Sequence, residues 1–538
     1  MEGTVRGASR GKKVHVVAIP YPAQGHIVPL MQLCLKITAN EGYMVTFVNT
    51  EHNHARMLQS QDGQGLEAGV GLEGISEKNI RLVGIPGGLR PELHGDPAYV
   101  VAAFESSEKL QAPLEELLDM MKQNGEPATC IISDVLVSWT QVCADKMRIP
   151  RIAFWTSSAA VYHVIWHMYT LFKQGEQNIK VHNVEFDCTG GMVSRIPGLP
   201  AMDVNDLPII VRSGPADFIH KFLCRQLEHM MRAVAMAVNT FDELEHECLQ
   251  ALSSSFPVRT YAVGPLLPDD GSQRSHDNGG LTSLMRPGAI QECLQAKSTR
   301  ALTNRRIGIF HEDYSCLEWL ENKPPRSVMY ISFGSICPMN EQQFVELVMG
   351  LQASGHRFLW SIRPDFVQGC KDYRTLLPAS FLECVKERGM LVSWVPQLKV
   401  LGHPAIGGFL THCGWNSTLE SVAMGVPMLC WPDVGERRTN GRLAVTVWRV
   451  GLDFSNARKQ AVGGVELIRR EEVRRVIGLL MDSSCESAKY VRRNAASLRI
   501  AAQRALATTG SSVRDWNLFI NYIPSPSSCV AKAQKLRK

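Results

Sequence analysis

The sequence has few of the features that mark a secreted, membrane-spanning or dinucleotide-binding protein. Its 15 cysteines are scattered singly along 538 residues without a CxxC pair, which predicts reduced thiols rather than a disulfide framework. No stretch approaches the ~20 apolar residues that cross a bilayer, and the first apolar run, Val14–Ile19, is too short for a signal peptide. No GxGxxG fingerprint follows a strand. We therefore expect a soluble cytoplasmic protein with no integral membrane segment.

Positive charge is in excess, but it is concentrated at the two ends of the chain. Of the net charge of +5, residues 1–13 contribute +3 and residues 524–538 contribute +4, which leaves −2 on the body between them. A nucleic-acid-binding domain carries its positive charge as a patch on the folded body. The distribution therefore predicts two flexible basic tails and no nucleic-acid partner.

Length and hydrophobic patterning predict two α/β domains in tandem. The chain exceeds the ~250–300 residues that one core supports. Strand, loop, helix and strand follow one another over residues 14–49, which indicates a βαβ unit in a parallel, doubly wound sheet, and a second alternating series begins at Ser327. The expected segments are a tail (1–13), a first domain (14–265), a linker with a mobile insertion (266–312), a second domain (313–510), a helix (511–523) and a tail (524–538).

A strand-to-helix turn in the second half carries a strong chemical signal. Ile406–His412 is predicted to be a strand, Cys413–Asn416 a tight turn and Ser417–Met424 a helix. Such a turn directs free backbone N–H groups and the positive end of the helix dipole at whatever lies there. The turn therefore predicts a metal-free site for a diphosphate, with side-chain donors from His412, Asn416 and Ser417.

Each of these residues also has a purely structural interpretation. Ser417 and Glu420 have the spacing of a capping box, which closes a helix N-terminus. His412 fits a hydrogen-bonded core histidine, and Trp394 and Trp415 fit core aromatic residues. The functional interpretation depends on all of them occurring in one short segment.

Residues 394–437 resemble the 44-residue signature box of plant family 1 UDP-dependent glycosyltransferases. The resemblance implies the GT-B fold, in which two Rossmann-like domains face each other across a cleft, with the helix at 511–523 packing back on the first domain. It further implies a monomeric enzyme of plant secondary metabolism. The box is carried by Trp394-Val-Pro-Gln397, Thr411-His-Cys-Gly-Trp-Asn-Ser417, Glu420-Ser421, Gly425-Val-Pro427 and Trp431-Pro432, and other family landmarks by Pro20–His26, Ile132–Asp134, Phe154–Thr156 and Ser332–Ser335.

The resemblance implies a site for a UDP-sugar co-substrate, with no cofactor and no metal. Trp394 would stack on the uracil and the backbone of Val395 would pair with its edge. Gln397 and Glu420 would hold the ribose. The remaining assignments are Ser335, His412, Gly414, Asn416 and Ser417 to the diphosphate, and Thr156, Trp415, Glu436 and Arg437 to the sugar.

A catalytic base is predicted in the first half. His26 lies where the first strand meets the first helix, and Asp134 follows the strand at Thr129–Ser133, so both reach the sheet edge where α/β proteins bind ligands. The helix N-terminus should keep His26 neutral; a structural role at the helix start is the alternative. The resemblance implies that His26 and Asp134 are the catalytic dyad, in which His26 deprotonates an acceptor that displaces UDP with inversion.

The end of the signature departs from the family pattern, which closes with Asp or Glu followed by Gln. Here Glu436 is followed by Arg437, which only donates hydrogen bonds and carries a fixed charge. Arg437 would suit the carboxylate of UDP-glucuronate, whereas Glu436 would repel it. We expect glucose, with Arg437 turned towards Glu436 or solvent. The alternatives are UDP-glucuronate, another UDP-sugar, or a degenerate relative that binds a UDP-sugar without catalysis.

The acceptor is weakly encoded. Residues 85–99 and 187–211 and the helix after Thr156 are expected to contact it. A small lipophilic compound with a hydroxyl or carboxyl group is expected. Either an aromatic pocket or ordinary core packing is indicated by Phe154, Trp155, Tyr162 and Trp166.

Overall fold

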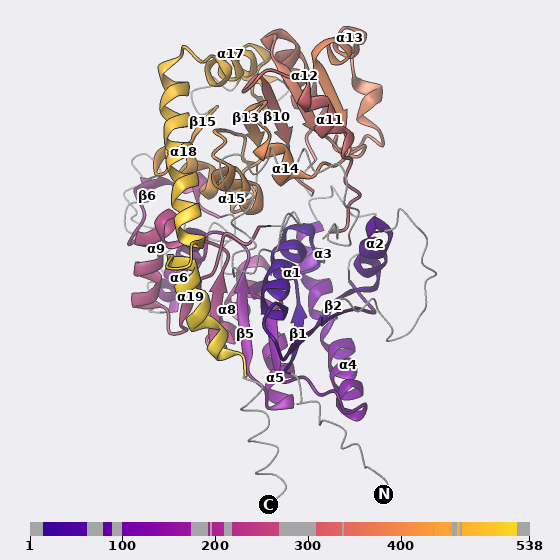
Figure 1. Cartoon of the computed structure of the whole chain (residues 1–538), viewed down its shortest axis with the longest axis vertical. Helices are drawn as coiled ribbons and strands as arrows, with labels where there is room; N and C mark the ends of the chain where they lie inside the picture. Colours follow the sequence, from indigo (N-terminus) through magenta and orange to yellow (C-terminus); the bar gives the residue numbers. More distant parts are fainter. Residues whose placement is uncertain are drawn as a thin grey trace, which may run out of the picture.

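The computed structural model shows two α/β halves stacked along the long axis of the molecule (Figure 1). The expected tail at 1–13, the expected tail at 524–538 except Pro524, and residues 268–304 of the expected linker, which hold the insertion, lie outside the described residues. Those residues are 14–61, 79–88, 99–173, 192–193, 196–208, 218–267, 308–335, 338–433, 435–454, 460–462 and 465–524.

The first half is built on a seven-stranded parallel sheet with the strand order β3-β2-β1-β4-β5-β8-β9. The strand order reverses between β1 and β4, which creates the edge position where doubly wound sheets bind ligands. The strands are β1 (Val14–Ile19), β2 (Tyr43–Thr50), β3 (Ile80–Ile85), β4 (Cys130–Asp134), β5 (Arg151–Trp155), β8 (Ala235–Val238) and β9 (Thr260–Ala262), with a separate hairpin of β6 (Met192–Val193) and β7 (Met202–Asp203).

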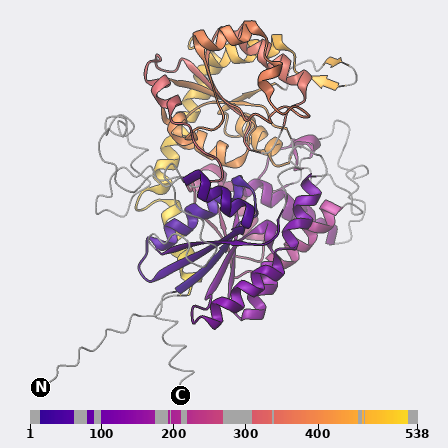
Figure 2. The ribbon, with the colours of Figure 1, turned by 90° about the vertical axis from the view of Figure 1, so that its right-hand side faces the viewer.

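Helices cover both faces of this sheet (Figure 2). Alternate residues of β1 point to opposite faces: Val16 joins the core under α1, and Val17 joins the core under α4 and α5. This double burial explains why the strands are continuous apolar runs. The helices are α1 (Gln24–Thr38), α2 (Glu51–Gln61), α3 (Tyr99–Glu108), α4 (Gln111–Gln123), α5 (Thr140–Met147), α6 (Ala159–Lys173), α8 (Phe218–Met230) and α9 (Asp242–Ser255), with 3-10 turns η2 (Val135–Val137) and η3 (Val204–Asp206).

The second half repeats the architecture with a six-stranded parallel sheet of order β12-β11-β10-β13-β14-β15. The two sheets confirm the predicted pair of doubly wound α/β units. The strands are β10 (Val328–Ser332), β11 (Arg357–Ser361), β12 (Gly389–Val392), β13 (Ile406–Thr411), β14 (Met428–Cys430) and β15 (Gly451–Asp453), plus a hairpin of β16 (Gln460–Val462) and β17 (Val465–Leu467). The helices are α11 (Ser315–Glu321), α12 (Glu341–Ser354), α13 (Ala379–Arg388), α14 (Gln397–Gly402), α15 (Trp415–Met424), α16 (Arg437–Thr446) and α17 (Arg470–Met481), with the 3-10 turn η4 (Tyr373–Leu376).

Two C-terminal helices connect the halves. The long helix α18 (Glu486–Leu506) descends from the second half, and α19 (Ser511–Phe519), followed by the turn η5 (Ile520–Tyr522), lies along the first (Figure 1). Ser512 donates a hydrogen bond to the Gly264 carbonyl, and Asp515 accepts one from the Ala262 backbone N–H at 2.9 Å. The end of the described chain is therefore anchored beside β9.

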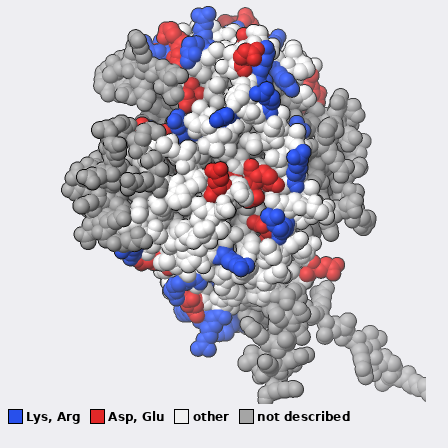
Figure 3. Space-filling model, turned by 90° about the vertical axis from the view of Figure 1, so that its left-hand side faces the viewer, with Lys and Arg blue, Asp and Glu red and all other residues white. Residues whose placement is uncertain are grey.

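The surface of the described residues carries mixed charge on the face in Figure 3. Lysine and arginine side chains are interspersed there with aspartate, glutamate and uncharged surface. Among the helices of the described ranges, none combines the length and apolar character needed to cross a membrane.

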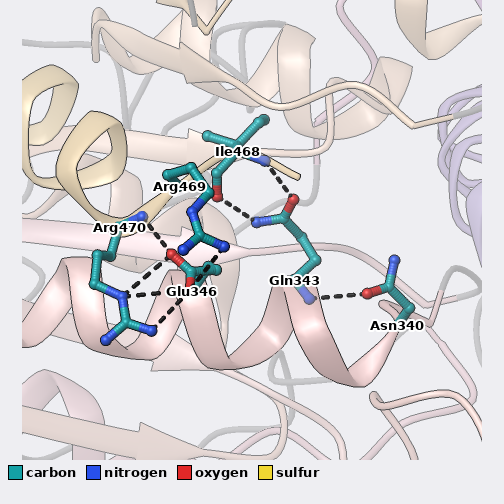
Figure 4. A network of polar contacts seen from close by, with 6 residues as sticks. All are labelled: Asn340, Gln343, Glu346, Ile468, Arg469 and Arg470. Atoms are coloured by element: carbon teal, nitrogen blue, oxygen red, sulfur yellow. Dashed lines mark hydrogen bonds and ion pairs between the residues drawn. The ribbon is translucent and has the colours of Figure 1, made fainter. Parts of the chain in front are cut away.

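A buried polar network joins α12 to the segment that precedes α17 (Figure 4). The Glu346 carboxylate is buried and accepts hydrogen bonds from the Arg470 backbone N–H at 2.6 Å and from Arg470 Nη2 at 2.7 Å. Gln343 donates to the Ile468 carbonyl at 2.9 Å and accepts from the Ile468 N–H at 2.9 Å. Two side chains on one face of α12, Gln343 and Glu346, thus bind the backbone groups of Ile468 and Arg470, and Glu346 also neutralises the charge of Arg470.

We expect Glu346→Gln to lower the free energy of unfolding by about 1–3 kcal/mol, because a buried charge-assisted network loses its charge. Burial raises the pKa of Glu346, but its bonds to Arg470 outweigh burial and hold the pKa below 4.5. The stabilisation is therefore present at neutral pH and lost as pH falls through that lowered value. Urea unfolding followed by circular dichroism measures the effect. The matched control, Glu383→Gln in the exposed pair with Lys386, should change stability by under ~0.5 kcal/mol; equal losses in both variants would contradict the prediction.

Candidate active site

His26 and Asp134 meet at the carboxyl edge of the first sheet. His26 is in the first turn of α1, the helix that follows β1, and Asp134 is the last residue of β4. The strands β1 and β4 are neighbours in the sheet. Nδ1 of His26 lies 2.7 Å from Oδ2 of Asp134. Because a carboxylate only accepts, Nδ1 carries the hydrogen and Nε2 is left as the basic atom. The other oxygen of Asp134 accepts from the Leu136 N–H at 2.8 Å, which fixes the carboxylate.

Thr156 lies next to His26 and Asp134. Its hydroxyl is 2.9 Å from Nδ1 of His26 and 3.4 Å from Oδ2 of Asp134. Thr156 follows the end of β5, the strand beside β4, so its hydroxyl helps to fix both side chains. Its predicted contact with the sugar stays a prediction.

The electrostatics of His26 differ from the expectation based on the helix dipole. Burial lowers the pKa of His26, but the charge and hydrogen bond of Asp134, with a smaller contribution from the charge of Glu436, raise it above the ordinary value of 6.5. The expected lowering is therefore wrong, since a full carboxylate charge at 2.7 Å outweighs the partial charge of a helix end.

The predicted strand–turn–helix forms the second component of the site. The helix α15 begins at Trp415 with Gly414 as its N-cap. Ser417 is therefore inside the helix, and the capping-box interpretation of Ser417 and Glu420 is wrong. Cys413 has a φ of 63°, which turns the chain sharply from β13 into α15. The backbone N–H groups of the first helical turn consequently open to the cleft.

His412 immediately precedes Cys413 and this turn, one residue after the end of β13. Its side chain is buried, and burial followed by the charge of Arg437 lowers the pKa of His412 to about 3. His412 is therefore a neutral hydrogen-bonding group at physiological pH. Gly334 and Gly414 flank its Nε2 so closely that a Cβ at either position would collide with the ring. These two glycines keep the ring accessible.

A hydrogen-bond network joins the residues assigned to the ribose. Gln397 Nε2 donates to Glu420 Oε2 at 2.7 Å and to Ser417 Oγ at 2.9 Å, and its Oε1 accepts from the Tyr330 hydroxyl at 2.9 Å. Burial raises the pKa of Glu420 to about 7. Sequence reasoning missed Tyr330, because a tyrosine inside a buried strand carries no motif.

An aromatic stack lies at the mouth of the cleft. Phe310 packs on Trp394 with ring centroids 4.3 Å apart and planes 21° from parallel, and the Arg56 guanidinium lies 4.8 Å from the Phe310 centroid. Val395, next in sequence to Trp394, is buried. A cavity of about 520 Å³ is bordered by residues of both halves, among them Asn53, Arg56, Phe310, Ser335, Arg363 and Trp394.

Direct contacts bring the two halves of the site together. Asn416 Nδ2 donates to the Gly25 carbonyl at 2.9 Å, one residue from His26. The Trp415 indole N–H donates to the Asn239 carbonyl at 2.7 Å, and the Trp415 side chain is buried. The Trp415 ring thus holds α15 against the first half, and its predicted contact with the sugar stays a prediction.

Arg437 is turned towards neither Glu436 nor solvent. Its Nη1 lies 2.8 and 2.7 Å from the two carboxylate oxygens of Asp433. Glu436 is the N-cap of α16 and Arg437 its first residue. The sequence interpretation missed Asp433, although its i,i+4 spacing to Arg437 is visible in the sequence.

The aromatic residues expected near the acceptor belong to the core. Phe154, Trp155, Tyr162 and Trp166 are all buried, and Trp155 packs edge-on against Tyr162. Core packing is thus the correct alternative. A different aromatic series begins at the base: Tyr21 lies 5.1 Å from His26 and 5.9 Å from Phe104, and Phe104 stacks on Phe222 at 4.3 Å, all between ring centroids. Of the segments expected to contact the acceptor, residues 89–98, 187–191, 194–195 and 209–211 lie outside the described residues. Residues 192–193 and 196–208 are described and include the β6–β7 hairpin and the turn η3.

The arrangement combines a carboxylate-oriented base with an anion-binding helix start across one cleft. Within the described ranges, no group of three or more His, Cys, Asp or Glu residues is placed to hold a metal ion. Such a site can deprotonate a hydroxyl on one side and bind a leaving diphosphate on the other.

Comparisons with known proteins match both halves. The family model described as "UDP-glucoronosyl and UDP-glucosyl transferase" matches residues 311–462, and the model "Glycosyltransferase, N-terminal domain" matches residues 12–196.

Similar proteins cover nearly the whole chain. UDP-glycosyltransferase 85A2 of Arabidopsis thaliana is 36% identical over 524 residues, which are 96% of this chain and 99% of that protein. The 7-deoxyloganetin glucosyltransferase of Gardenia jasminoides is 36% identical, covering 93% of this chain and 95% of that protein. The structure of Phytolacca americana UGT2 with UDP-2-fluoro-glucose and pterostilbene is 26% identical with a TM-score of 0.70, covering 94% and 99% of the two chains. With its fold, the chain therefore belongs to the plant family 1 UDP-dependent glycosyltransferases and is a UDP-glycosyltransferase of GT-B fold.

Proposed function

We propose that the protein transfers glucose from UDP-glucose to a hydroxyl or carboxyl group of a small lipophilic acceptor, with inversion at the anomeric carbon. The observation that carries this proposal is the 2.9 Å hydrogen bond from Asn416 to the Gly25 carbonyl. It joins the anion-binding start of α15 to the residue next to His26, so a base and a leaving-group site border the same cleft.

In this proposal His26 acts as the general base. Asp134 and Thr156 hold its Nδ1, so Nε2 takes the proton of the acceptor hydroxyl. The acceptor oxygen forms a bond to the anomeric carbon while the bond from that carbon to the diphosphate oxygen breaks. The leaving oxygen keeps the electron pair. Asp134 stabilises the positive charge that His26 gains.

The start of α15 receives the diphosphate. Backbone N–H groups after Gly414, the neutral ring of His412 and the side chains of Asn416 and Ser417 supply donors, with Ser335 on the neighbouring loop. Their charge-stabilising effect is strongest in a cleft from which water is excluded. Trp394 would stack on the uracil beside Val395, and Gln397 and Glu420 would bind the ribose. These assignments need no metal ion.

Glucose is the proposed sugar for two reasons. One similar protein is named a glucosyltransferase, and one similar structure contains UDP-2-fluoro-glucose. In addition, Arg437 is already paired with Asp433, which removes the free cation that a uronate would need.

For the acceptor, we propose a small apolar compound that lies against the partly exposed ring of Tyr21, which is 5.1 Å from the ring of His26. Phe104 and Phe222 are buried and support this ring from the core. A similar structure holds pterostilbene, and a similar protein is named for 7-deoxyloganetin. Because base and diphosphate site come from one chain, we also propose that the monomer is the active form, in the cytoplasm.

His26→Ala should reduce kcat/KM by about 10²–10⁴, since general base catalysis contributes that much. UDP-glucose binding, measured by calorimetry without acceptor, should stay within about twofold because the donor residues lie in the second half. His246→Ala, an exposed histidine on α9, is the matched control with unchanged turnover. Undiminished turnover in His26→Ala would refute the base assignment, and binding without turnover in the wild type would favour the degenerate-relative alternative.

The pH dependence of kcat/KM should report the raised pKa of His26. Only the neutral imidazole accepts a proton, so with a hydroxyl acceptor the rate should fall on the acid side with a midpoint above 6.5. In Asp134→Asn the raising charge is lost while burial remains, so the midpoint should move below 6.5 as kcat drops. The hypothesis fails if the variant keeps the wild-type midpoint.

Binding of UDP-glucose should tighten as pH rises through about 7. Glu420, with a pKa of about 7, must be a carboxylate to accept from two ribose hydroxyls. Calorimetry without acceptor between pH 6 and 8 should therefore show stronger binding at the higher pH, with proton release below pH 7. Glu420→Gln should bind more weakly and lose this component of the pH dependence. An identical pH dependence in both proteins would exclude Glu420 from the ribose site.

A further inference from the structure

Asp433 and Arg437 form a shielded ion pair at the edge of the cleft. Nη1 of Arg437 lies 2.8 Å from Oδ1 and 2.7 Å from Oδ2 of Asp433. The Arg437 side chain is 12% exposed, against 32% for Asp433. Arg438 Nε donates to the Asp433 carbonyl at 2.8 Å, which ties Asp433 to the first turn of α16. Both members of the ion pair are therefore held at the start of this helix.

Helix stability does not account for Arg437. It is the first residue of α16, where the positive end of the helix dipole disfavours a cation. Asp433, placed just before the helix, offsets this repulsion. The chain thus carries a cation where its backbone disfavours one, together with an acid that neutralises it.

The start of α16 borders the space between the base and the diphosphate site. The charge of Glu436 acts on His26, and the charge of Arg437 acts on His412. One turn further on, Asn440 donates to the Cys413 carbonyl at 3.2 Å and accepts from the Ser158 hydroxyl at 3.0 Å. These bonds tie α16 both to the turn before α15 and to the first half. A sugar that reacts between His26 and His412 would lie near the start of α16.

We propose that Asp433 determines which sugar donor the enzyme accepts, because it occupies Arg437 and so selects neutral hexoses over uronates. This inference rests on the proposed function. A uronate carboxylate would have to replace Asp433 on the guanidinium and would then lie beside two carboxylates, Asp433 and Glu436. A neutral hexose meets no such repulsion, and its hydroxyls can donate to Glu436.

Two variants test the proposal because they should act in opposite directions. Steady-state kcat/KM is measured for UDP-glucose and UDP-glucuronate with one acceptor, and competitive inhibition constants are measured for both donors. Asp433→Asn removes the carboxylate charge beside the guanidinium and should raise the preference for UDP-glucuronate over UDP-glucose at least tenfold. Arg437→Gln removes the positive charge beside Asp433 and should lower that preference below the wild-type value. In the double variant the gain of Asp433→Asn should disappear.

The control is Glu383→Gln, which removes an equally charged but exposed carboxylate on α13 and should keep the wild-type donor ratio. Transfer of neither sugar by the wild type would overturn the proposed function itself. If the wild type transfers glucose, the proposed function stands and two results would overturn only the inference about Asp433. One is a donor ratio in folded Asp433→Asn equal to that of the wild type. The other is a shift of the donor ratio in the same direction in both single variants. Should Asp433→Asn fail to fold, a donor ratio in Arg437→Gln that is unchanged or raised overturns it.

Discussion

The hydrogen bond from the Trp415 indole to the Asn239 carbonyl, 2.7 Å long and buried, is the contact on which the rest of the site depends. It presses the first turn of α15 against the first half, and the next residue, Asn416, then reaches the Gly25 carbonyl. Neither half has all of the groups of the candidate site, because His26 and Asp134 lie in one half and the start of α15 lies in the other. The apolar cluster around Trp415 contains Phe241 and Trp448 as well, so burial and hydrogen bonding stabilise the same docked arrangement.

Two histidines with opposite electrostatics follow from this docking. His26 is paired with a carboxylate, and its pKa is raised; His412 is buried near arginines without such a pair, and its pKa falls to about 3. The same burial disfavours the charged form of both rings, and only the neighbouring charge distinguishes them. A histidine beside Asp134 can gain a proton during a reaction, whereas His412 stays neutral and keeps a hydrogen-bonding role. The neighbouring charges thus give two chemically identical imidazole rings opposite pKa shifts.

Much of this could be predicted from the sequence, where local patterning decides the outcome. Strands such as Val14–Ile19 and Arg151–Trp155 end where predicted, because both faces of a parallel sheet demand an unbroken apolar run. The dyad was predictable since parallel strands place their carboxyl ends on one edge. The orientation of Trp415, the hydroxyl of Thr156 and the aromatic series from Tyr21 to Phe222 were not, because each depends on contacts between segments far apart in the chain. Periodicity also cannot separate the core aromatics around Tyr162 from ring systems near a ligand.

At position 437 the chain carries a positive charge at a helix start, where the helix dipole disfavours it. Replacing a neutral amide by a guanidinium at a helix start should weaken both the helix and its anion site, because a cation there opposes the dipole and competes for the anion. Asp433 removes both costs at once, since a carboxylate four residues earlier reaches the same guanidinium from the preceding loop. The backbone of β14, the loop and α16 therefore need not change. In the proposal above, donor choice depends on these two side chains and not on the fold. Donor specificity can then be altered by substitutions at these positions while the backbone that positions the catalytic groups is kept.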